Sequence, residues 1–285
     1  MSYKKVIIIG APRSGTNMLR DILCSFDCIS TWPCDEINYI WRYGNHHHIS
    51  DEFTVDMAAP KIASYIQRKF DWVAQKHNAQ IVVEKTCANS LRVPFVDKII
   101  PDSKYIFIYR DGLDVVGSSM DRWQAPLDLV YLAKKARFVP ISNLPYYAYR
   151  YLLNRLYRIF SFKNRLAFWG PQLHNMVELL ANHSLDEVCA IQWQACVDKA
   201  ATAFDIMPND RWIALSYENF TSNPEAALLD ILDFIGISAR AEQIRNAVAN
   251  VSVASVGKGR SALSAESVHR LERITHTTLL RLGYI

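Results

Sequence analysis

The stretch KKVIIIGAPRSGTNMLRDIL, Lys4–Leu23, decides the fold of this 285-residue chain. Its apolar run Val6–Ile9 shows no polar alternation, which is typical of a parallel strand buried on both faces. A turn bounded by Gly10 and Gly15 follows, and the chain beyond it reads as a helix to about Phe26. In such a turn the backbone N–H groups and the positive end of the helix face the same point. The stretch therefore predicts a strand, an anion-binding loop and a helix.

The composition of this loop argues against a nucleoside triphosphate as its ligand. A triphosphatase loop places Lys directly after the second Gly, and here that position is Thr16. The basic residue is Arg13, inside the loop, and no obvious Asp for magnesium follows a strand. Gly15 allows a ligand to approach the backbone closely, while Ser14, Thr16 and Asn17 add side-chain donors. The alternative is a plain glycine-rich connection without a ligand.

Further strands and helices alternate along the chain, which predicts an α/β fold: a parallel sheet flanked by helices, with ligands at the carboxyl ends of the strands. The expected strands are Ile81–Val83, Tyr105–Tyr109 and Trp212–Leu215, and the expected helices are Met57–Ala79, Gly112–Arg122, Pro224–Ile235 and Ser264–Leu282. Because no composition break is visible, residues 1–285 are expected to form a single domain.

One region interrupts the alternation. Residues 123–171 are rich in Tyr, Phe, Trp, Arg and Lys, and we interpret them as a mostly helical insertion over the sheet. Its aromatic rings could line a sugar-binding groove, its basic and aromatic residues could rest on an anionic membrane surface, or the rings could form a local core.

Charge and terminal sequence limit the partners and the compartment. The net charge is +4, from 32 basic and 28 acidic residues, which disfavours bulk nucleic-acid binding but suits a site for an anionic ligand. The opening MSYKK leads directly into a strand, and no apolar run approaches the roughly 18 residues of a membrane span. We therefore expect a cytoplasmic protein. A location at the inner face of the membrane is compatible with this expectation. The six cysteines are expected to be reduced, and those near the amino terminus lack the CxxC spacing of a zinc site.

A second candidate anion site lies in YIFIYRDGLDVVGSSMDRW, residues 105–123. Arg110 stands at the end of a predicted strand, and Ser118 lies about two turns into the following helix. A guanidinium at a strand end is a natural phosphate ligand. The alternative is that Arg110 pairs with Asp111 or Asp114 on the surface.

Together, the two elements resemble the family of sulfotransferases that use 3'-phosphoadenosine 5'-phosphosulfate (PAPS). That family has a PRSGT or PKSGT loop for the 5'-phosphosulfate and a strand–Arg–x7–Ser segment for the 3'-phosphate. The resemblance extends to VVEKTCANSLRVPFVDKIIPDSKYIFIYRDG, to IALSYENFTSNPEAALLDILDFIGI and to the terminal VGKGRSALS and LLRLGYI. It covers most of the chain outside residues 123–171 and is strongest to the bacterial, glycan and tyrosylprotein branches, which carry Arg in the loop.

The resemblance implies transfer of a sulfuryl group from PAPS to an acceptor hydroxyl, without a metal, and a glycan or glycolipid as the acceptor. The loop would hold the 5'-phosphosulfate, Tyr217 would lie near the nucleotide, and a basic loop would close over the phosphates. The implied cofactor-binding residues are Arg13, Ser14, Gly15, Thr16, Asn17, Arg110, Ser118, Tyr217, Lys258 and Arg260.

Two basic residues are candidates for stabilising the leaving group. Negative charge builds on the bridging oxygen as the sulfuryl group leaves, and Arg13 is the first candidate to stabilise it. Lys85, at the end of IVVEK, resembles the catalytic Lys of the tyrosylprotein branch. The alternative is a salt bridge between Lys85 and Glu84, and a shift of one residue would direct Glu84 to the site instead.

The candidate general base is an acidic residue. The small-molecule branch carries a His after Lys-Thr, but here that position is Cys87. The segment TWPCDEINYIW matches the acidic pair of the Arg-loop branches, which favours Glu36 as the base, with Asp35 and Glu84 as the alternatives.

The triplet His46–His48 is a weak metal motif, because adjacent residues point in different directions and lack the i,i+4 spacing of a zinc helix. We interpret it as a polar loop near the acceptor and expect no metal site.

Two rival functions remain at this level. A nucleotide kinase of the same fold would require a metal and bind ATP, and a non-catalytic nucleotide-binding module would keep Arg110 and Ser118 but need neither Lys85 nor Glu36.

Overall fold

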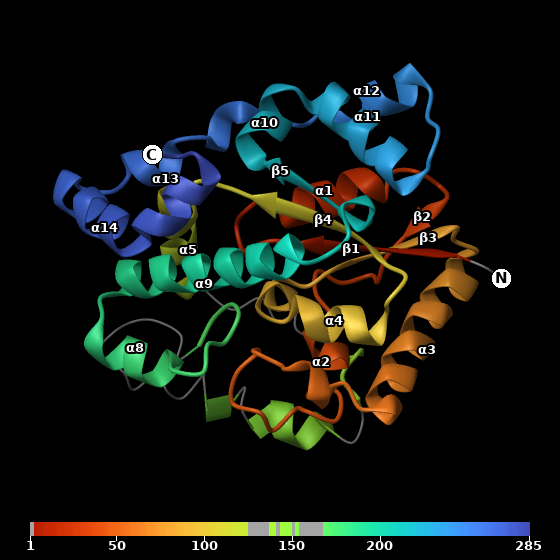
Figure 1. The fold of residues 1–285 in the computed structure, drawn as a ribbon, viewed down its shortest axis with the longest axis horizontal. Helices are drawn as coiled ribbons and strands as arrows, with labels where there is room; N and C mark the ends of the chain where they lie inside the picture. The colour runs from red at the N-terminus through yellow and green to blue at the C-terminus, as the bar shows by residue number, and fades with distance from the viewer. Residues whose placement is uncertain (1–2, 125–136, 141–142, 150–151, 154–167) are drawn as a thin grey trace.

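The computed structural model of the chain describes residues 3–124, 137–140, 143–149, 152–153 and 168–285. Its centre is a five-stranded parallel sheet with the order β2-β3-β1-β4-β5 (Figure 1). The strands are β1 (Lys4–Ile9), β2 (Ile29–Ser30), β3 (Ile81–Lys85), β4 (Lys104–Tyr109) and β5 (Trp212–Ser216). The predicted α/β fold with a parallel sheet is therefore confirmed. The short β2 was not predicted, because two residues carry no periodicity.

Helices cover both faces of the sheet. They are α1 (Thr16–Leu23), α2 (Asn38–Trp41), α3 (Pro60–His77), α4 (Val93–Ile99), α5 (Gly112–Gln124), α8 (Met176–Asn182), α9 (Leu185–Asp205), α10 (Tyr217–Ser222), α11 (Pro224–Ile235), α12 (Ala241–Val248), α13 (Lys258–Ser261) and α14 (Ala265–Leu282). In Figure 1, α1, α11 and α12 lie on one side of the sheet and α3, α4 and α9 on the other.

Strand β1 separates two hydrophobic cores. Ile7 and Ile9 pack into the core beneath α3, α4 and α9, whereas Val6 and Ile8 pack into the core beneath α1, α11 and α12. All four side chains are buried, as the unbroken apolar run predicts for a central parallel strand. Since every strand pair is parallel, the segments that leave β1, β3, β4 and β5 emerge at one edge of the sheet.

Several helix boundaries differ by a few residues from the sequence expectation, most of all in α1 and α3. Helix α1 ends at Leu23 instead of near Phe26, and Cys24 caps it. Helix α3 begins at Pro60 instead of Met57, because proline at the first helical position is preorganised for a helix start, and it ends where Asn78 adopts a left-handed backbone.

Most of the predicted insertion, residues 123–171, lies outside the described residues. Within its described part, residues 144–149 are helical, and Tyr146 packs edge-on against the rings of His46 and His47. Tyr147 contacts Tyr39 in the same manner. This part of the insertion therefore lies against α2 and the loop that follows it.

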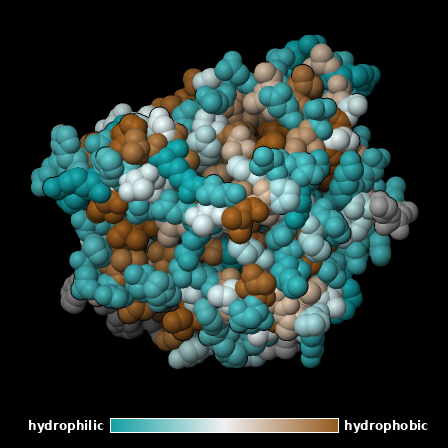
Figure 2. Space-filling model, in the orientation of Figure 1, coloured by the Kyte–Doolittle hydropathy of each residue, from teal (hydrophilic) through white to brown (hydrophobic). Residues whose placement is uncertain are grey.

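Apolar side chains are scattered among polar ones over the face drawn in Figure 2. Within the described ranges, no helix combines the length and apolarity needed to cross a bilayer.

Candidate active site

The glycine loop connects β1 to α1 at the carboxyl edge of the sheet. Two of its residues have left-handed backbones: Arg13, with φ 70°, and Gly15, with φ 88°. A Cβ atom at Gly15 would lie 2.5 Å from a ring carbon of Tyr217, and one at Gly10 would lie 2.4 Å from the carbonyl oxygen of Ile108. Neither position therefore has room for a side chain, and the loop lies in close contact with β4 and α10.

The predicted 3'-phosphate residue Arg110 lies at the centre of this site. Its guanidinium donates to the carbonyl oxygen of Arg13 at 3.3 Å, to the Asp114 carboxylate at 3.1 Å and to the carbonyl oxygen of Ser255. The same group lies over the Tyr217 ring, 4.4 Å from its centroid. The alternative pairing with Asp114 thus does occur, but the pair is buried inside the site and is not part of a surface cluster.

Arg13 joins the two predicted phosphate sites. Its Nε donates to the Ser118 hydroxyl at 2.8 Å, although the two residues are 105 positions apart. Burial lowers the pKa of Arg13, and the nearby charges of Arg122 and Arg110 lower it further. Three cations gathered at one place favour an anionic occupant.

Two buried polar atoms at this site point to a ligand. Within the described part of the chain, the Ser14 hydroxyl oxygen and the Arg110 Nε have no hydrogen-bond partner. Buried donors are nearly always satisfied, so an unpaired pair beside a glycine loop fits a phosphate or sulfate group. Thr16 lies deeper, with its hydroxyl 3.7 Å from the Cys87 sulfur, and Asn17 is exposed at the first turn of α1.

Asp114 fastens the carboxy-terminal basic loop to α5. Its buried carboxylate accepts the backbone N–H of Gly257 at 2.7 Å and that of Arg260 at 3.0 Å. The loop approaches the helix closely, because a Cβ at Gly117 would lie 2.8 Å from the Cα of Gly259. From the sequence, Asp114 was only a possible partner of Arg110, since no local pattern indicates a contact across 143 residues.

The two basic residues of that loop face different surroundings. Lys258 is exposed. Arg260 donates to the Asp111 carboxylate at 3.0 Å and to that of Glu272 at 2.7 Å, so its charge is already paired. The structure therefore brings both residues next to the Arg110 segment without directing the Arg260 side chain into the glycine loop.

Lys85 and Glu36 form an ion pair beside the glycine loop. The Lys85 ammonium donates to Glu36 Oε1 at 3.1 Å, and the backbone N–H of Cys87 donates to the same oxygen at 3.2 Å. Burial by itself would lower the pKa of Lys85, but the neighbouring Glu36 carboxylate outweighs it, and the pKa is raised. This raised pKa favours the charged form of Lys85. Burial raises the pKa of the Cys87 thiol, which keeps it protonated.

Glu84 lies on the opposite face of β3 from Lys85, as alternation along a strand requires. It is fully buried and accepts hydrogen bonds from the Thr86 hydroxyl and from the Asn89 amide, the latter at 2.9 Å. Burial raises its pKa to about 7. Of the three candidate carboxylates, Glu36 is the one that faces Lys85, because Asp35 turns toward Arg20, 3.5 Å away.

The side chains of the histidine triplet make local contacts. The His48 ring interacts with Ser50, and the His46 and His47 rings lie against each other and against Tyr146. Within the described ranges, no group of three or more His, Cys, Asp or Glu side chains is placed to hold a metal ion.

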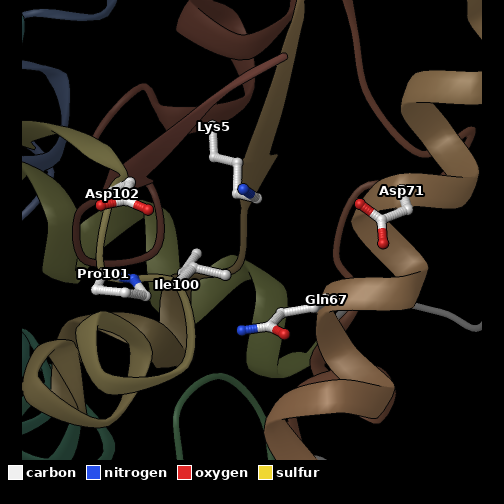
Figure 3. Close-up of a pocket in the computed structure, with 6 residues that line it drawn as sticks. All are labelled: Lys5, Gln67, Asp71, Ile100, Pro101 and Asp102. Atoms are coloured by element: carbon white, nitrogen blue, oxygen red, sulfur yellow. The ribbon is translucent and has the colours of Figure 1, made fainter. Parts of the chain in front are cut away.

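A shallow hollow of about 220 Å³ lies at the other end of the sheet (Figure 3). It is lined by Lys5, Gln67, Asp71, Ile100, Pro101 and Asp102. Lys5 is near the start of β1, and residues 100–102 precede β4, so this hollow is at the amino edge, away from the glycine loop. None of the predicted site residues lines it.

The doubly covered parallel sheet, with a glycine loop and clustered arginines at its carboxyl edge, defines an α/β protein with a site that suits a phosphorylated ligand. The chain belongs to the sulfotransferase family, because the model of the sulfotransferase domain matches residues 3–281. This family supports sulfotransfer activity and implies PAPS as the sulfuryl donor. A search of curated proteins finds no match.

Several solved sulfotransferase structures have a similar fold. The sulfotransferase domain of the curacin biosynthetic pathway has 13% identity and a TM-score of 0.51, over 92% of this chain and 83% of its own. The corresponding domain of the Synechococcus PCC 7002 olefin synthase has 12% identity and a TM-score of 0.52, over 95% and 94%. Sulfotransferase STF9 from Mycobacterium avium has 13% identity and a TM-score of 0.50, over 98% and 76%. At these identities the likeness concerns the fold alone.

Proposed function

We propose that this protein transfers the sulfuryl group of PAPS to a hydroxyl of a glycan or glycolipid. The observation that carries the proposal is the junction of the two phosphate-binding segments. Arg110 holds the carbonyl of Arg13, and Arg13 reaches Ser118, while Ser14 and Arg110 each keep an unpaired buried donor. A donor molecule with a 5'-phosphosulfate and a 3'-phosphate would satisfy both ends of this junction.

The proposed division of the cofactor site follows from this junction. The backbone of residues 13–17, together with the Ser14 and Thr16 hydroxyls, would receive the phosphosulfate at the start of α1. Arg110 and Ser118 would receive the 3'-phosphate, and Tyr217 would lie against the nucleotide. The loop that carries Lys258 and Arg260 would cover the phosphates.

The chemistry needs cations that stabilise the charge of the leaving group and a proton acceptor for the attacking hydroxyl. As the acceptor oxygen bonds to sulfur, the bond from sulfur to the bridging oxygen breaks and leaves negative charge on 3',5'-diphosphoadenosine. Arg13 and Lys85 are the cations proposed to stabilise that charge. Glu36 is proposed to take the proton of the acceptor hydroxyl, since a free alcohol is only weakly nucleophilic near neutral pH. The Glu36 side chain is 27% exposed, whereas the Lys85 side chain is 3% exposed.

The glycan or glycolipid acceptor is supported by the surroundings of the Glu36 segment. Tyr39 lies three residues after Glu36, and its ring contacts that of Tyr147. The Tyr147 ring in turn contacts that of Tyr146, which packs against the His46 and His47 rings. Aromatic side chains next to a hydroxyl-acceptor site suit the apolar faces of sugar rings.

Calorimetric titration tests the donor assignment. We expect 3',5'-diphosphoadenosine to bind without magnesium and more tightly than ATP does with it. Magnesium-dependent ATP binding of greater affinity would instead favour a nucleotide kinase. A panel of cell-envelope sugars and glycolipids incubated with labelled PAPS then tests the acceptor, and tight 3',5'-diphosphoadenosine binding without transfer to any hydroxyl would favour the non-catalytic module.

A further inference from the structure

A buried polar chain runs behind the Lys85–Glu36 pair. It begins at Glu84, whose two carboxylate oxygens accept from Thr86 and Asn89. These three side chains are fully buried. The proposed sulfuryl transfer has no use for Glu84, because its carboxylate faces the interior. A buried ionisable group nevertheless costs free energy, so a role for it is expected elsewhere.

The Thr86 hydroxyl connects Glu84 to the segment that carries Glu36. A hydroxyl has one hydrogen to donate. Thr86 gives that hydrogen to Glu84, which leaves its oxygen lone pairs to accept the backbone N–H of Ile37 at 3.2 Å. Ile37 directly follows Glu36, and the Glu36 carboxylate is itself held by the N–H of Cys87. The orientation of the Thr86 hydroxyl thus depends on the acceptor that Glu84 supplies.

A second route from Glu84 reaches the same segment. Asn89, fixed by Glu84 through its amide nitrogen, accepts from Arg92 Nε at 2.9 Å. Arg92 then donates to the side chain of Asn38, and Asn38 donates to Asp51 at 3.1 Å. The backbone of Ile37 is therefore held through Thr86, and the side chain of Asn38 through Arg92 and Asn89. Both chains of hydrogen bonds end at the Glu84 carboxylate.

We propose that Glu84 is a positioning residue, which holds the Glu36 carboxylate against Lys85 through the Thr86 hydroxyl and through Asn89. The inference rests on the proposed role of Glu36 as the general base. It assigns Glu84 no contact with the donor or the acceptor. A displacement of the base by about 1 Å can lower turnover about 100-fold.

The matched pair Thr86→Val and Thr86→Ser tests this directly, because valine keeps the shape and removes the hydroxyl, whereas serine keeps the hydroxyl. Turnover is measured with labelled PAPS and octyl glucoside as the acceptor. We expect Thr86→Val to lower kcat about 10- to 100-fold, with the KM for PAPS and the Kd of 3',5'-diphosphoadenosine within about twofold of the parent. Thr86→Ser should restore kcat to within a few-fold. Equal kcat in the two variants would overturn the proposal.

A double-mutant cycle with Glu36→Gln separates positioning from a merely structural role. If Thr86 acts through Glu36, the valine change should have little further effect once Glu36 has lost its basicity. If the kcat of the double variant is lowered by the product of the two single effects, the inference is refuted, while the assignment of Glu36 as the base is unaffected. Undiminished turnover in Glu36→Gln alone would reject Glu36 as the base, and the inference with it.

Hydrogen exchange provides a readout that needs no acceptor. The Ile37 amide should exchange faster in Thr86→Val and in the milder variant Glu84→Gln than in Thr86→Ser, at unchanged protection of β1 and β4. Unchanged Ile37 protection in both changed variants would contradict the proposal even if Thr86→Val proved too unstable for kinetics.

Discussion

The exchange of Arg110 for lysine tests the assignment of the 3'-phosphate site. Lysine keeps the positive charge beside the buried Asp114 carboxylate, so it avoids the uncompensated buried charge that Arg110→Ala would create. It cannot reproduce the guanidinium contacts to the Arg13 carbonyl, Asp114 and the Ser255 carbonyl, nor offer the unpaired Nε to a ligand.

The expected magnitude follows from the loss of a charge-assisted contact. Such a contact contributes about 1.5–3 kcal/mol, which corresponds to about a 10- to 150-fold rise in Kd. We expect this rise for 3',5'-diphosphoadenosine, whereas adenosine 5'-phosphosulfate, which lacks the 3'-phosphate, should change less than about threefold. The control Arg281→Lys changes an exposed arginine on α14 that pairs with Asp205.

Isothermal titration calorimetry of both ligands against the parent, Arg110→Lys and Arg281→Lys makes the comparison. A thermal melt of each variant shows whether the fold is retained. Equal losses for the two nucleotides would refute the assignment of Arg110 to the 3'-phosphate, because they would show that the arginine acts on both ligands through its contact with the Arg13 carbonyl.

Four further predictions concern the metal, the base, the buried carboxylate and the insertion. Sulfuryl transfer should continue in excess EDTA, since the cations of the site are side chains; loss of activity that magnesium restores would contradict this. Glu36→Gln should lower the single-turnover rate about 10²- to 10⁴-fold at unchanged affinity for 3',5'-diphosphoadenosine, and a rate within a few-fold of the parent would exclude Glu36 as the base. Burial raises the pKa of Glu84 from 4.5 to about 7. Between these two pH values the carboxyl group is protonated in the folded state and ionised in the unfolded state, so the free energy of unfolding should fall by about 3 kcal/mol as the pH rises from 4.5 to 7. Denaturant titrations of Glu84→Gln across this window should lack that fall, and an identical pH dependence in parent and variant would contradict the shift. Leu152 and Leu153 are 55% and 46% exposed, and the insertion, residues 123–171, holds eight basic residues and one acidic residue. Changing both leucines to Glu should therefore weaken sedimentation with phosphatidylserine vesicles. The exposed Ile206→Glu is the control, and equal sedimentation of all three proteins would argue against membrane contact through the insertion.

Local patterns were sufficient for the elements that flank the site. The apolar run Val6–Ile9 predicted a strand buried on both faces, because burial on both faces removes polar alternation. The spacing of Gly10 and Gly15 predicted an anion loop, since the backbone conformation at Gly15 has a positive φ that glycine adopts without strain. The alternation of strands and helices then predicted the parallel sheet, and with it the carboxyl edge as the expected place for a ligand.

The relations between these elements depended on the tertiary structure. Arg13 meets Ser118 because β1 and β4 are neighbours in the sheet, and Glu36 meets Lys85 because the chain after the short β2 returns across the end of β3. The sequence left Asp35, Glu36 and Glu84 open as bases, since a strand pattern does not fix the register of a loop beside it.

Through Asp114, α5 holds a loop more than 140 residues away, and through Thr86, Glu84 reaches the backbone of Ile37. The sequence by itself determined the chemistry available at each strand end, because backbone conformation and burial leave local signatures. Only the tertiary structure decided which of these groups share a contact, because hydrogen bonds between distant segments depend on sheet order and loop path, neither of which has a local signal.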